Sequence, residues 1–160
     1  MDLRPAILAE FALSERIVRD GHEVVPRFQI LAPDGEHTIM VQLPDDPADR
    51  AERLRAVQSF MVWKAAQGFL FAAELAQPDA ISVIAVTRAN ATGALRRIQR
   101  QPLFLEAVEW MGRESIGEEM VSLLPARAVE LSKAELAFMQ RAFAEGAVPG
   151  ISWRGPEDGR

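Results

Sequence analysis

Residues 47–77 read PADRAERLRAVQSFMVWKAAQGFLFAAELAQ, and this stretch decides the fold that the sequence predicts. Asp46 can cap a helix that begins here, Pro47 suits its first position, and Asp49 lies in its first turn. Pro78 marks the end of the helix. At 100° per residue, apolar side chains cover a broad face and part of the opposite side. A helix of this kind must be enclosed, so the pattern predicts one long central helix.

The opposite side of this predicted helix carries a second apolar stripe among Lys64, Gln67 and Glu74. Cover by another helix of the same chain would explain the stripe. The alternative is self-association, because aromatic-rich faces with scattered polar groups resemble interface cores. A lone tryptophan near the C-terminus could likewise dock on its own domain or on a neighbour. The predicted interface residues are Phe60, Trp63, Leu70, Phe71 and Trp153.

The remaining chain predicts shorter elements around the long helix. Helices are expected at 5–20, 92–101, 115–124 and 132–145, and strands at 23–31, 37–43, 80–86 and 103–111. The turn 32–35, with Pro33 and Gly35, joins the first two strands as a hairpin. Ser132 and Glu135 have the spacing of a capping box.

These elements predict an α+β fold. A mixed or antiparallel sheet of about four strands would pack around one long central helix, with shorter peripheral helices outside. Residues 1–146 would form a single globular α+β domain. Residues 147–160 would form a Gly/Pro-rich C-terminal tail, because glycine and proline resist regular structure.

The composition excludes several classes of protein. The net charge of −5 argues against a protein built chiefly to coat nucleic acid. The chain has no cysteine, which excludes thiol chemistry and fits a cytoplasmic location. Charged residues interrupt every long apolar run, so no membrane span is expected. Neither glycine-rich phosphate-binding pattern occurs, and no cofactor is predicted.

A basic stretch without acidic residues lies between Asp79 and Glu106. On the helix predicted over 92–101, its arginines would share one face beside a helix start that can hold an anion. Nucleic acid or a phosphate ligand could bind there. The alternative is a solvated helix whose arginines pair with the chain's own carboxylates. The candidate residues for this site are Arg88, Thr92, Gly93, Arg96, Arg97 and Arg100.

A second candidate site is acidic. The register of the predicted hairpin pairs His37 near Ile30 and brings the distant His22 toward the aspartates after the second strand. Such a cluster could hold a divalent metal and support a metal-dependent enzyme. The alternative is that the aspartates simply cap the long helix. The candidate ligands are His22, Glu23, Asp45 and Asp49.

No catalytic signature accompanies these features. No serine lies in a Gly-x-Ser-x-Gly turn, and neither histidine is placed beside a serine nucleophile. The sequence therefore predicts a non-enzymatic cytoplasmic interaction or accessory protein that forms a homodimer or binds another protein. Binding of nucleic acid or a phosphate ligand, and divalent-metal-dependent catalysis, are the alternative hypotheses.

Overall fold

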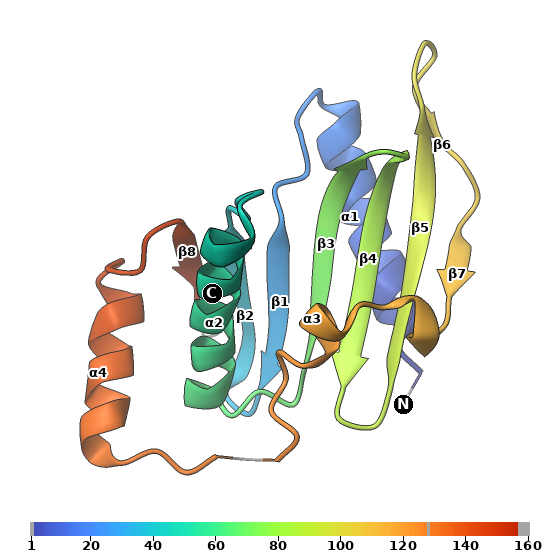
Figure 1. Ribbon diagram of the computed structural model, residues 1–160. Helices are drawn as coiled ribbons and strands as arrows, with labels where there is room; N and C mark the ends of the chain where they lie inside the picture. The colour runs from blue at the N-terminus through green and yellow to red at the C-terminus, as the bar shows by residue number, and fades with distance from the viewer. Residues whose placement is uncertain (1, 128, 157–160) are drawn as a thin grey trace.

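A computed structural model describes residues 2–127 and 129–156. Over these residues one antiparallel sheet is packed between helices (Figure 1). The elements are, in chain order, α1 (Arg4–Arg19), β1 (Arg27–Ala32), β2 (Gly35–Val41), α2 (Pro47–Trp63), β3 (Gly68–Ala76), β4 (Asp79–Thr87), β5 (Ala91–Gln99), β6 (Phe104–Leu105), β7 (Glu109–Met111), the 3-10 turn η1 (Arg113–Ser115), α3 (Glu118–Val121), α4 (Lys133–Ala144) and β8 (Ile151–Arg154).

The sheet has eight strands in the described part of the chain. Its order is β6-β5-β4-β3-β1-β2-β8, and β7 pairs with β5 beside this path. Helix α1 covers one face over β3 and β4, whereas α2 and α3 lie on the other face, and α4 lies outside α2 (Figure 1). Each face therefore has its own hydrophobic core.

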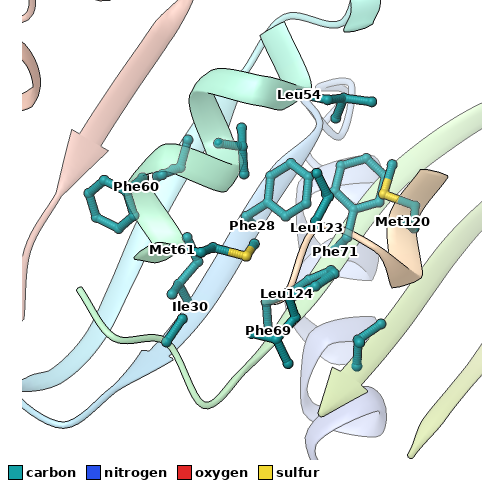
Figure 2. Close-up of a cluster of buried hydrophobic side chains, with 14 of the residues drawn as sticks. Phe28, Ile30, Leu54, Phe60, Met61, Phe69, Phe71, Met120, Leu123 and Leu124 are labelled. Atoms are coloured by element: carbon teal, nitrogen blue, oxygen red, sulfur yellow. The ribbon is translucent and has the colours of Figure 1, made fainter. Parts of the chain in front are cut away.

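The core under α2 is the larger one. It includes Phe28, Phe69 and Phe71 from the sheet and Phe60 and Met61 from α2, all of them buried, and the Phe60 ring points away from the three phenylalanines of the sheet (Figure 2). The core under α1 contains the buried side chains of Ile7, Phe11, Leu70, Ile81, Val83 and Ala94. Strand β3 supplies side chains to both cores, because successive residues of a strand point to opposite faces.

The predicted long central helix over 47–77 is wrong, and so is the sheet of about four strands. Helix α2 ends at Trp63, Ala65 has a positive φ of 52°, and the chain enters β3 at Gly68. The first six residues of β3 are all buried between the two helical layers. A central strand covered on both faces produces the same all-round apolar pattern as an enclosed helix.

The helix predicted over 92–101 is also wrong, because this segment forms β5. Ala94 and Ile98 face the core under α1, and Ala91 faces the other core. The three-residue spacing of Leu95 and Ile98 suggested a helix. In a segment this short, however, the helical period and the two-residue period of a strand cannot be told apart. The strand predicted over 103–111 exists only as β6 and β7, which are separated by an irregular stretch.

The predictions for the first helix, the first hairpin and the last helix are confirmed, whereas Pro78 lies in the β3–β4 turn and does not end a helix. Helix α1 matches the helix expected at 5–20, and the β1–β2 hairpin pairs Ile30 with His37. Ser132 and Glu135 form the capping box of α4. After α4, Gly146 adopts a φ of +66°, a left-handed conformation that glycine permits and that reverses the chain.

The segment after Gly146 packs back onto the sheet. Strand β8 pairs with β2, with Val41 opposite Ile151 and Thr38 opposite Arg154. The predicted tail covered 147–160, and its residues 157–160 lie outside the described part of the chain. Among the described residues, β8 is the last strand at this edge of the sheet.

Candidate interaction surface

The arginines predicted to bind an anion are separated in the structure. On β5, Arg96 pairs across from Ile81 and Arg97 from Ala80, so the two side chains point to opposite faces. Arg88 lies at the other end of the β4–β5 hairpin, and Arg100 follows the end of β5. The structure therefore does not bring the four arginines together on one face.

Each of these arginines contacts an acceptor of its own chain. Arg88 donates to the carbonyl oxygens of Pro125 and Ala66, at 3.1 and 3.2 Å. Arg96 donates to the carbonyl oxygens of Glu106 and Leu105, at 2.8 and 3.1 Å, and Arg97 lies 3.0 Å from the Glu109 carboxylate. Arg100 lies 2.7 Å from the Asp79 carboxylate. The hydrogen bond from Arg100 holds the pKa of Asp79 below its ordinary value.

Thr92 and Gly93 lie in a strand and not at a helix start. The Thr92 hydroxyl donates to the Met111 carbonyl oxygen at 3.3 Å. A methyl group added at Gly93 would lie 3.2 Å from the Met111 side chain and 3.3 Å from the Val83 carbonyl oxygen. The close approach of neighbouring strands therefore accounts for this glycine.

The four predicted metal ligands, His22, Glu23, Asp45 and Asp49, are all exposed. Among the described residues, no group of three or more histidine, aspartate and glutamate side chains is arranged to hold a metal ion. Asp46 caps α2 by accepting a hydrogen bond from the Asp49 backbone N–H at 3.0 Å. Capping thus explains part of this acidic cluster.

The five predicted interface residues are buried or half-buried against their own chain. Phe60, Leu70 and Phe71 are buried, whereas Trp63 and Trp153 are half-buried. Phe60 is the centre of an aromatic cluster. Its ring centroid lies 5.5 Å from that of Trp63, 5.0 Å from that of Phe143 on α4 and 5.7 Å from that of Trp153 on β8.

Sequence reasoning missed a different apolar surface, which lies on α4. Among the described residues of this helix, only Phe143 is buried, while Met139 and Ala142 are half-buried. Leu136 is 41% exposed, and Phe138 is 60% exposed, the highest value among the exposed large apolar side chains. The sequence contains a sign of this surface. At 100° per residue, Phe138 lies away from the apolar stripe formed by Leu136, Met139 and Phe143, so it points to another side of the helix.

Phe138 borders a groove of about 520 Å³ between α4 and α2. The apolar lining consists of Phe138, Met139, Ala142, Phe143, Ala147, Val148 and Pro149, with Ala56 from α2. Arg141 and Glu145 lie at the same groove and are exposed. Neither has an ion-pair partner among the described residues. The site is therefore an open apolar groove with one charge of each sign.

Comparisons of this chain with protein-family models, with curated proteins and with solved structures found no match. In the described part of the chain, none of the helices has the length and apolar character needed to cross a membrane. The fold and the groove on α4 are therefore the observations from which a function can be argued.

Proposed function

We propose that this protein is a non-enzymatic interaction or accessory protein that acts in the cytoplasm and self-associates through the α2–α4 groove. The observation that carries this proposal is the position of Phe138. It is the most exposed large apolar side chain among the described residues, and it also forms a wall of the apolar groove. An exposed aromatic side chain beside an apolar groove is typical of an interaction site.

A second copy of the chain is the occupant that fits this groove. In a two-fold dimer, the same patch of each subunit meets the other, so Phe138 of each copy can enter the groove of its partner. The groove of about 520 Å³ is large enough for a phenyl ring. In such a dimer, the Phe138 side chain of one copy fills the groove of the other copy, and it also lines the groove of its own copy.

The charges at the groove support the same arrangement. Arg141 and Glu145 are one helical turn apart on α4. Within one helix, a glutamate that follows arginine by four residues is the less favourable order for an ion pair. When two α4 helices pack antiparallel across a two-fold axis, Arg141 faces Glu145 of the partner subunit. Both charges then gain a partner, and the pair favours the antiparallel register.

Sedimentation velocity of three variants at tens of micromolar tests this proposal. We expect a dimer for the wild type and a monomer for Phe138→Glu, because a buried carboxylate at the centre of an interface is strongly unfavourable. Phe104→Glu is the matched control, since Phe104 is 48% exposed and lies on β6 at the opposite edge of the sheet. It should remain a dimer. A monomeric wild type would refute the proposal, and dissociation by both substitutions would place the interface elsewhere.

A further inference from the structure

The side chain of His37 is buried, and both of its ring nitrogens have a hydrogen-bond partner. Its Nδ1 lies 3.1 Å from the indole Nε1 of Trp153 on β8. Its Nε2 lies 2.7 Å from the Asp34 carboxylate in the β1–β2 turn. The side chain is 1% exposed, and its ring stacks on Trp153 with centroids 5.9 Å apart and meets the Phe60 ring edge-on. His37 thus joins three segments that are far apart in the sequence.

The two partners specify the protonation state of the ring. An indole N–H can only donate, so Nδ1 of His37 must accept and carry no hydrogen. A carboxylate accepts, so Nε2 must carry the hydrogen and donate it to Asp34. The hydrogen bond between Trp153 and His37 therefore requires a neutral imidazole in one tautomer.

A second proton on this ring affects the two bonds differently. The bond from Nε2 to Asp34 persists and gains the attraction between opposite charges. At Nδ1, the new N–H would face the indole N–H of Trp153, so two donors would oppose each other without an acceptor. Protonation of His37 therefore preserves its contact with the turn and removes its contact with β8.

Within residues 2–127 and 129–156, two charged groups lie near His37. These are Asp34, whose carboxylate contacts Nε2, and Lys64 at the end of α2, with Nζ 3.5 Å from the Asp34 carboxylate and over the ring of Trp63. Glu36 and Arg154 belong to strand positions whose side chains point to the other face of the sheet. From α4, the uncharged ring of Phe143 packs into the same aromatic cluster.

We propose that His37 and Trp153 form a pH-sensitive latch that holds β8 on the edge of β2 when His37 is neutral and releases β8 when His37 is protonated. The strand has only four residues and pairs with β2 alone among the described strands, so side-chain contacts contribute much of its attachment. Release would expose the edge of β2 and open the aromatic cluster around Phe60. This latch does not depend on the self-association proposed above.

Solution NMR across about pH 8 to about pH 5, where histidine ordinarily titrates, tests the latch in the wild-type protein. The chain has two histidines and three tryptophans, so the relevant signals are few. We expect the indole N–H resonance of Trp153 to shift with the same midpoint as the His37 ring. The hydrogen-exchange protection of the β8 amides bonded to β2 should fall about fivefold over this range, once intrinsic exchange rates are corrected. The indole resonance of Trp110, on β7, should not follow His37.

The variant Trp153→Phe retains an aromatic ring and removes the N–H donor, so β8 should lose the pH dependence of its protection. Trp110→Phe is the matched control and should behave like the wild type. An unchanged Trp153 resonance while His37 titrates would overturn the proposal. The same conclusion would follow if His37 stayed neutral until the whole domain unfolded, or if Trp153→Phe showed the full pH dependence of the wild type.

Discussion

Trp63, the last residue of α2, stacks on Phe143 of α4 with ring centroids 5.6 Å apart and ring planes at 8°. Phe143 is the one buried side chain among the described residues of α4. The remaining apolar side chains of this helix are exposed or half-buried. Phe143, which contacts both Trp63 and Phe60, therefore anchors the helix that carries the proposed interaction surface.

Replacing Phe143 should detach α4 from α2. We expect Phe143→Ala to lower the free energy of unfolding by about 3 kcal/mol, the cost typical of removing a buried aromatic side chain. Hydrogen exchange of the α4 amides should increase, while exchange of the β3 and β4 amides should change little. Leu136→Ala is the control on the same helix and should change stability by less than about 0.5 kcal/mol, because Leu136 is exposed. Equal effects of the two substitutions would show that Phe143 does not position α4.

Charge reversal tests the antiparallel arrangement of α4 in the proposed dimer. We expect Arg141→Glu to weaken self-association about tenfold, because two like charges would face each other across the interface. The double variant Arg141→Glu with Glu145→Arg exchanges both charges and should restore the wild-type dissociation constant. Sedimentation equilibrium at two salt concentrations measures both effects. A double variant that is as weak as the single one would contradict the antiparallel register.

The parts of the fold that the sequence predicts correctly depend on local interactions. Pro47 and Asp46 mark the start of α2, and the Ser132–Glu135 capping box marks the start of α4. Each signal involves atoms only a few residues apart, so it can be read from the chain. The position of the β1–β2 turn is predictable for the same reason.

The prediction failed where distant residues determine the structure. In β3, Phe69 pairs with Ile30 on one side and with Val86 on the other. The alanines around it favour a helix locally, and the partners that make the segment a strand are not recognisable in the sequence. The placement of the arginines differs from the predicted one for the same reason, because the acceptors of Arg88 are the carbonyl oxygens of Pro125 and Ala66, which are distant in the sequence. Which face of α4 stays uncovered is likewise decided by tertiary packing.

Gly68 allows β3 to begin close to β4. A methyl group added there would lie 2.9 Å from the Val86 carbonyl oxygen and 3.2 Å from the Thr87 side chain. Because the nearest atom belongs to the backbone, relief requires the strands to move apart. We expect Gly68→Ala to lower the free energy of unfolding by about 1–3 kcal/mol. Gly117→Ala is the control, since its added methyl group would have no atom of the described residues within 4 Å apart from its own chain neighbours. Urea unfolding of both variants measures these changes. If Gly68→Ala and Gly117→Ala had equal effects, the short distance between the strands would not be the reason for glycine at position 68.

Acid should weaken the protein through Asp34. Partial burial raises the pKa of Asp34, but the hydrogen bond and charge of His37, together with the charge of Lys64, outweigh burial and hold this pKa below its ordinary value of 3.8. A carboxyl group whose pKa is lower in the folded state contributes stability above its unfolded pKa and loses it as the pH falls through its folded pKa. Asp34→Asn should therefore be less stable than the wild type at about pH 6, and the difference should shrink as the pH falls below 3.8 and through the lower pKa of the folded state.

Thermal unfolding of the two proteins across this range measures the effect of Asp34. Asp45→Asn is the matched control, because Asp45 is exposed and takes part in no ion pair among the described residues. Its Tm should follow that of the wild type at every pH. If the Tm difference between Asp34→Asn and the wild type did not shrink as the pH was lowered below 3.8, the loss would come from altered packing of the turn and not from the charge of the carboxylate.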